Sequence, residues 1–131
     1  MTPFIQTIEK LEHSKIVITQ AIESLNWDEA EKEADALRDY VTCFYCIEYR
    51  LELKGHFEGV CGICPCHKLG EKILGRPRGC NGCYVIQVYR DMVRNAHWFE
   101  EVKSEDSGKA LVASIQNVID YMNAHKEELG G

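Results

Sequence analysis

The sequence predicts an all-α protein, an antiparallel helical bundle made of two hairpins with a cysteine-rich insert between them. Apolar residues in both flanks recur at intervals of three and four, which places them on one face of a helix. All seven cysteines fall between positions 43 and 83, and neither flank contains one. A length of 131 residues suits a single domain. We therefore expect helical hairpins over residues 1–42 and 84–131, joined by a cysteine-rich module over residues 43–83.

The first hairpin is predicted from two helix-start signals and two apolar stripes. Thr2 can cap a helix that has Pro3 at its first position. Asn26 and Glu29 have the spacing of a capping box, which predicts a second helix beginning near Trp27. The first stripe consists of Phe4, Ile8, Leu11, Ile18, Ile22 and Leu25, and the second of Trp27, Ala30, Ala34, Leu37, Val41 and Phe44.

The second hairpin is predicted from the same periodicity. A polar break over residues 104–108 separates a third helix from a fourth. We expect Trp27 to be buried at the turn of the first hairpin, against Phe4 or Ile8 and the third helix. The stripe of the third helix consists of Val85, Tyr89, Met92, Ala96, Phe99 and Val102, and that of the fourth of Leu111, Ile115, Val118 and Met122.

Six of the seven cysteines form three pairs with two residues between the partners. Tetrahedral zinc, with bonds of about 2.3 Å, needs sulfur atoms roughly 3.8 Å apart, and such pairs can supply that edge. The spacing C-x2-C-x14-C-x2-C is close to that of structural four-cysteine zinc sites. We expect one zinc ion, with two zinc ions or an iron–sulfur cluster as alternatives. The expected ligands are Cys43, Cys46, Cys61 and Cys64, or a set in which Cys80 and Cys83 replace one pair, with Cys66 as a possible extra ligand.

The thiols also bear on the cellular compartment. An odd number of cysteines with no secretory signal argues against a disulfide framework, because cytosolic thiols stay reduced. No apolar run approaches the roughly 20 residues of a membrane span. We therefore expect a cytoplasmic protein with no membrane partner.

Charge is distributed unevenly along the chain, which carries a net charge of −6. Both flanks are acidic, with nine acidic and four basic residues in 1–40 and eight acidic and four basic residues in 91–131. The middle of the chain is basic, with four acidic and seven basic residues in 41–90. The acidic flanks oppose attraction to bulk nucleic acid and favour a protein partner. The alternative is a zinc-dependent nucleic-acid-binding regulator, because a local basic site can still contact phosphates. Its candidate residues are Lys68, Lys72, Arg76 and Arg78.

Catalytic motifs are not found. Catalytic zinc usually keeps an open position and ligands rich in histidine or carboxylate, whereas this module is rich in thiolate. His56 and Glu58 match the H-x-E of zinc deaminases, but no proline precedes Cys61 as that family's second motif requires. Phosphate-binding glycine loops and nucleophile elbows are absent from the sequence. We predict a non-enzymatic protein that acts through protein–protein interaction.

One resemblance concerns the last two cysteine motifs. Cys64 and Cys66 with proline between them, followed by Cys80 and Cys83, resemble the cysteine order of redox-switched zinc chaperones of the heat-shock-protein-33 type. The resemblance implies a zinc–thiolate redox switch. Zinc-bound thiolates can be oxidised where they are accessible, so the chemistry permits that function.

A second resemblance covers most of the chain. Residues 27–37 leading into the first cysteine pair, then the second pair with Pro65, then Gly79 with Cys80, resemble small uncharacterised cysteine-rich proteins of bacteriophage genomes. The resemblance implies a phage or mobile-element accessory or inhibitor protein. It also implies metal ligands at Cys43 or Cys46, Cys61, Cys64 and Cys80.

Overall fold

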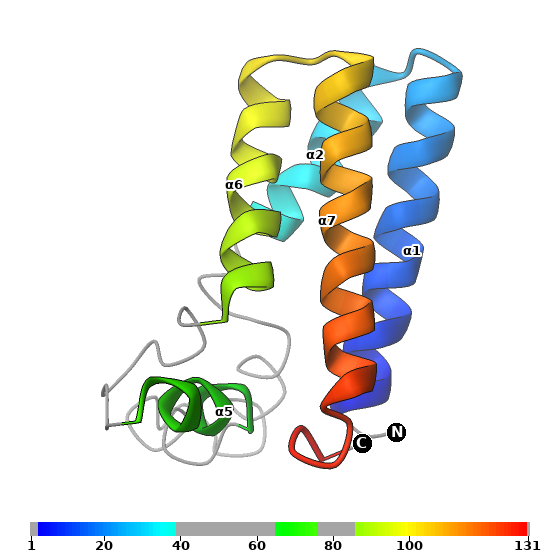
Figure 1. The fold of residues 1–131 in the computed structure, drawn as a ribbon. Coiled ribbons are helices and arrows are strands. Elements are labelled where there is room, and N and C mark those ends of the chain that lie inside the picture. Colours follow the sequence, from blue (N-terminus) through cyan, green and yellow to red (C-terminus); the bar gives the residue numbers. More distant parts are fainter. Residues whose placement is uncertain (1–2, 39–64, 76–85, 131) are drawn as a thin grey trace, which may run out of the picture.

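The computed structural model describes residues 3–38, 65–75 and 86–130, and within these segments it contains five helices and no strand (Figure 1). The all-α prediction is confirmed for these residues. None of the helices in this part of the chain is both long enough and apolar enough to cross a membrane. The helices are α1 (Pro3–Glu23), α2 (Trp27–Arg38), α5 (Pro65–Leu74), α6 (Gln87–Glu101) and α7 (Glu105–Ala124).

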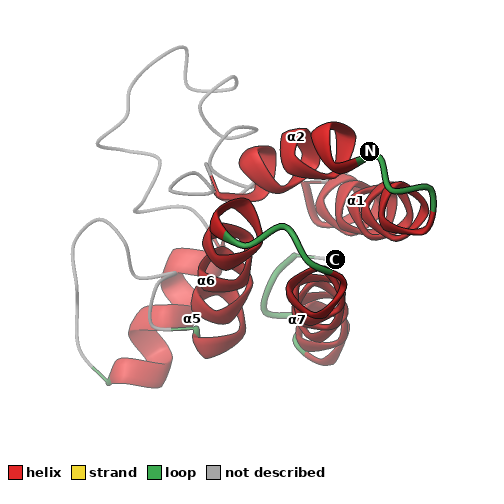
Figure 2. Ribbon diagram, turned by 90° about the horizontal axis from the view of Figure 1, so that it is seen from above, coloured by secondary structure: helices red, strands yellow, loops and turns green. Residues whose placement is uncertain are grey.

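The four helices α1, α2, α6 and α7 pack around a common apolar core. α1 contacts α2 and α7, and α6 also contacts α2 and α7, so each of the four has two neighbours. α1 and α7 run side by side in opposite directions (Figure 1), and the view from above shows α2 beside both α1 and α6 (Figure 2). The largest fully buried side chains are those of Phe99, Leu11, Ile18, Leu37, Ile86, Met92, Leu111, Ile115, Met122, Leu129 and Val118.

The apolar stripes of the second hairpin agree closely with its buried residues. All four members of the α7 stripe are buried, and the four central members of the α6 stripe are buried as well. Val102 is an exception, with 49% of its surface exposed, because the chain has already left α6 at that position. Val85, the first member of the α6 stripe, lies outside the described residues.

The stripe of α1 contains polar residues that the prediction omitted. Thr7 and Ser14 are buried and complete the inward face between the predicted apolar positions. Leu25, predicted as a stripe member, is 70% exposed and has a φ of 58° in the turn after α1. In α2 the three central members of the stripe are buried, whereas Val41 and Phe44 lie outside the described residues.

Two helix starts are fixed by side-chain caps. At α2 the backbone N–H of Glu29 donates to Asn26 Oδ1 (3.4 Å), which is the cap that the spacing predicts. The reciprocal bond differs from that of a capping box, because Asn26 Nδ2 donates to Glu29 Oε2 (3.0 Å) while the Asn26 backbone N–H donates to the Ala21 carbonyl oxygen (2.7 Å). At α7 the Ser104 hydroxyl accepts from the backbone N–H of Ser107 (3.1 Å). The prediction of a polar break over residues 104–108 is therefore wrong at its C-terminal end. The cap begins α7 at Glu105, and Gly108 lies inside the helix.

The segment 65–75 forms a short helix that the sequence analysis did not anticipate within the cysteine-rich module. Leu69 of α5 is buried and belongs to the apolar core. Lys72 forms an ion pair with Glu128, with 3.0 Å between Nζ and Oε2, and so joins α5 to the segment after α7. α5 lies at the lower end of the molecule in Figure 1, with Gly75 following it at a φ of 79°.

Trp27 occupies only part of its predicted environment. Its ring is half-buried and lies 6.2 Å from the ring of Phe99, measured between centroids, so the expected contact with α6 is present. The expected contact with Phe4 or Ile8 is wrong. These two residues lie in the first two turns of α1, whereas Trp27 follows the last turn of that helix, roughly 25 to 30 Å away along its axis.

Candidate functional site

The predicted metal site falls largely outside the described residues. The predicted ligands that lie outside the described residues are Cys43, Cys46, Cys61, Cys64, Cys80 and Cys83. The possible extra ligand Cys66 lies in the first turn of α5. Among the residues that the structure does describe, no three histidine, cysteine or acidic side chains gather in an arrangement that could hold a metal ion.

The predicted basic site is described in part. Lys68 is exposed on α5, and Lys72 forms its ion pair with Glu128. Glu128 also contacts His125, with 2.9 Å between Oε1 and Nδ1, and the hydrogen bonds from His125 and Lys72 lower the pKa of the Glu128 carboxyl. Arg76 and Arg78 lie outside the described residues. Lys72 is therefore already paired with a carboxylate, which reduces its attraction for a phosphate.

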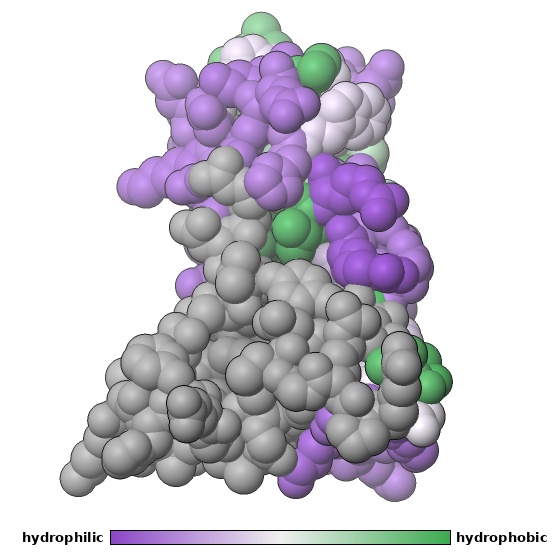
Figure 3. Space-filling model, turned by 90° about the vertical axis from the view of Figure 1, so that its left-hand side faces the viewer, coloured by the Kyte–Doolittle hydropathy of each residue, from purple (hydrophilic) through white to green (hydrophobic). Residues whose placement is uncertain are grey.

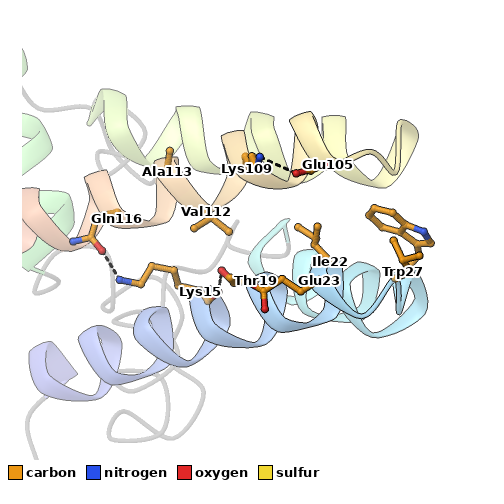
Figure 4. A pocket seen from close by; sticks show the side chains of 11 residues that line it. Lys15, Thr19, Ile22, Glu23, Trp27, Glu105, Lys109, Val112, Ala113 and Gln116 are labelled. Atoms are coloured by element: carbon orange, nitrogen blue, oxygen red, sulfur yellow. Dashed lines mark hydrogen bonds and ion pairs between the residues drawn. The ribbon is translucent and has the colours of Figure 1, made fainter.

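A groove that the sequence did not predict lies between α1 and α7 (Figure 4). It has a volume of about 860 Å³. Residues of the turn between α1 and α2 close one end. We call it the α1–α7 groove, and its lining residues are Lys15, Thr19, Ile22, Glu23, Leu25, Trp27, Glu105, Lys109, Val112, Ala113 and Gln116.

The floor of the α1–α7 groove is apolar. The side chains of Ile22 and Val112 both project into the space between the two helices (Figure 4), and both pack on the core. A shallower hollow continues along α1 beside the groove, and there Ile16 is 51% exposed. Exposed aliphatic surface beside a hollow of this kind is suited to binding apolar side chains of another molecule.

The polar rim of the groove is largely paired within the chain. Lys15 Nζ donates to Gln116 Oε1 and forms an ion pair with Glu12 at 3.0 Å. Lys109 and Glu105 form an ion pair at 2.8 Å, and their hydrogen bond raises the pKa of Lys109 and lowers that of Glu105. Both rim residues of that pair therefore stay charged near neutral pH. Neither residue of this pair is therefore poised to exchange a proton near neutral pH.

A different face, formed by α2 and α6, is acidic. Asp28, Glu31, Asp35 and Glu100 line a hollow there together with Lys32. The upper part of the molecule seen in Figure 3 is predominantly hydrophilic. Lys103 pairs with Glu31 at 2.7 Å, and this hydrogen bond raises the pKa of the Lys103 ammonium.

The sequence contains a partial signal for the α1–α7 groove. Ile16 and Val112 are apolar residues that stand outside the buried stripes of their helices. Two apolar positions of this kind, on helices that pack together, indicate a second apolar strip beside the core-facing one.

Comparison of the chain with protein-family models, with curated proteins and with solved structures finds no significant match. The functional assignment therefore depends on the surfaces and motifs of the chain itself.

Proposed function

We propose that this chain is a non-enzymatic, zinc-binding helical protein that acts through protein–protein contacts made at the α1–α7 groove. The observation that carries the proposal is the apolar floor of that groove, with Ile22 and Val112 below and Ile16 exposed beside it. The rim charges largely satisfy one another within the chain, so binding a partner leaves few of them uncompensated.

The zinc part of the proposal is based on the cysteine spacing. The cysteines stand between the two helical hairpins, after α2 and before α6. A closed site with four thiolates would cross-link this connection and bring stabilising free energy of its own. In this proposal one zinc ion fixes the cysteine-rich module between the hairpins, and the protein works in the cytoplasm, where unbound thiols stay reduced.

The nucleic-acid alternative has less support. Lys72, one of its four candidate cations, is 3.0 Å from the Glu128 carboxylate. The acidic face of α2 and α6 adds to the repulsion of a polyanion. A local phosphate contact would have to overcome both effects.

A matched pair of arginine variants tests the protein-binding proposal. Ala113 is exposed and lines the groove, whereas Asn123 is exposed on the same helix and does not line it. Ala113→Arg should abolish stoichiometric, nuclease-resistant protein association, and Asn123→Arg should leave it intact. Association that survives Ala113→Arg would place the binding surface elsewhere. Submicromolar nucleic-acid binding that weakens with added salt would favour the regulator.

A further inference from the structure

On the α1 side of the α1–α7 groove, a base and an acid stand at equal distances on either side of Thr19. Lys15 and Glu23 stand four residues before and four residues after Thr19, and all three line the groove. We propose that the groove pairs with the same groove of a second copy of this chain, forming a two-fold symmetric dimer. The proposal rests on the proposed function, because it names the protein that occupies that binding surface.

The symmetry of such a dimer follows from helix geometry. If two copies of α1 lie antiparallel with the two-fold axis at Thr19, each pairing residue lies about 6 Å from the axis along the helix. Lys15 of one copy then faces Glu23 of the other, and the reverse contact follows by symmetry. Two complementary ion pairs therefore flank one axis.

The same axis aligns apolar side chains. Ile16 stands three residues before Thr19 and Ile22 three residues after it, so Ile16 of one copy faces Ile22 of the other. Val112 and Ala113 of α7 add apolar surface beside them. The half-exposed Ile16 side chain would lose its contact with water on dimerisation, which favours association.

The state of the two charged groups supports this arrangement. Lys15 is held at the groove by Gln116 and Glu12, with 25% of its side chain exposed, so little further ordering is needed for it to meet an acid. Among the described residues, no hydrogen bond or ion pair engages the Glu23 carboxylate. In the dimer, Glu23 would share Lys15 of the second copy with Glu12 of that copy, which already pairs with Lys15 at 3.0 Å.

Among the faces formed by the described residues, the groove is favoured for self-association by its local charge. Each chain carries a charge of −6, so two copies repel each other over most orientations. The groove is lined by two lysines and two glutamates and is therefore locally neutral. The acidic hollow on α2 and α6 would bring like charges together.

The size of the face sets the expected strength. The face around the two-fold axis covers residues 13–25, about 18 Å along the helix, because α1 ends four residues after Thr19. A surface two helices wide and of that length covers roughly 350 Å² per copy, about 700 Å² in total, which is in the range of weak, transient interfaces. We expect a weak, reversible dimer with a dissociation constant in the high micromolar range or above.

Sedimentation analysis of the full chain over a range of concentrations tests the proposal. The wild-type protein should approach twice its monomer mass of 15.0 kDa as concentration rises. Lys15→Glu and Glu23→Lys should each weaken self-association by at least about tenfold, because each creates two like-charge contacts per dimer. Lys126→Glu and Glu127→Lys are exposed controls outside the groove and should dimerise like the wild type.

Mixing the two groove variants gives the decisive comparison. Lys15→Glu supplies acids at both positions and Glu23→Lys supplies bases at both, so the mixture should form a heterodimer although neither variant self-associates. The double variant Lys15→Glu/Glu23→Lys should recover the homodimer. These rescues also show that the variants are folded.

Several outcomes would overturn the dimer. A wild-type protein that stays monomeric at all concentrations would do so, as would a dimer indifferent to the charge variants or a mixture that fails to associate. A monomer that captures a different protein, with capture lost in Ala113→Arg, would overturn the second-copy assignment and leave the proposed function standing. A protein that stays monomeric and captures no other protein through the groove would overturn both the dimer and the proposed function.

Discussion

Gly108 of α7 packs against Ile22 of α1 so closely that a Cβ at position 108 would lie 2.2 Å from Ile22 Cδ1. The same Cβ would lie 3.4 Å from Phe99 Cε2. The glycine therefore sets how near α7 approaches α1 and α6 at this level. Since Ile22 also lines the α1–α7 groove, this close approach positions part of the groove floor.

Gly108→Ala should destabilise the protein by up to about 1 kcal/mol, because the added methyl group must displace the end of the half-buried Ile22 side chain, and the gain in helix propensity offsets part of that cost. Thermal or chemical denaturation measures the change. In an Ile22→Ala background the contact is gone, and the same substitution should become neutral or stabilising by up to about 1 kcal/mol through helix propensity. Equal effects in both backgrounds would show that Ile22 is not the obstacle.

Trp27→Ala should lower the free energy of unfolding by about 2 kcal/mol. The ring is half-buried and contacts Phe99, so the loss should be smaller than the 3 to 5 kcal/mol typical of fully buried aromatic residues. Trp98→Ala is the matched control, because Trp98 is 41% exposed, and it should change stability by less than about 1 kcal/mol. The reverse order of the two effects would contradict the packing described for Trp27.

Much of the four-helix core could be predicted because its signals are local. The capping pair at Asn26 and Glu29 and the stripes of α6 and α7 depend on residue types within one helix. The end of the break near Gly108 was mispredicted because glycine was read as a helix breaker. Here it serves a long-range contact with Ile22 that no local pattern contains.

The α1–α7 groove and α5 were missed for different physical reasons. The groove depends on which outer faces of two distant helices come together. Ile16 and Val112 each mark an extra apolar position on their own helix, but the sequence does not show that the two positions meet, because that follows only from the packing of α1 against α7. The short helix α5 lies among cysteines, glycines and prolines, which are typical of loops. Its buried Leu69 and its Lys72–Glu128 ion pair are tertiary interactions.

Ser104→Ala should destabilise α7 by about 1 kcal/mol, because the hydroxyl accepts a hydrogen bond from the Ser107 backbone N–H at the helix start. Ser24 is a suitable control, since its exposed hydroxyl donates to the Gln20 carbonyl oxygen and caps no helix start. Ser24→Ala should change stability by less than about 0.5 kcal/mol. Denaturation curves of both variants give the comparison, and equal effects would argue against the cap.

The attachment of α5 to the segment after α7 should weaken in acid. Hydrogen bonds from His125 and Lys72 lower the pKa of Glu128 below its usual 4.5. A lowered folded-state pKa means that this stabilising contribution is fully present above about pH 4.5 and is lost as the pH falls through the folded-state pKa. The protection factors of the α5 amides, which compare observed with intrinsic exchange rates at each pH, should therefore fall over that acidic range. In Glu128→Gln the protection factors should already be lower at neutral pH and should not fall further over that range.

Removal of metal should affect the cysteine-rich module much more than the helical core. The protein purified without chelator should carry about one zinc ion per chain by elemental analysis, and Cys61→Ser should lose it because the substitution removes one of four thiolates. Cys66→Ser, at the expected spare position, should keep it. Most of the helical circular dichroism should survive chelation, because the apolar core is built mainly from side chains of α1, α2, α6 and α7, with Leu69 of α5 as a core residue from the cysteine-rich module. Iron with a visible charge-transfer band, or complete loss of helical signal on chelation, would contradict this prediction.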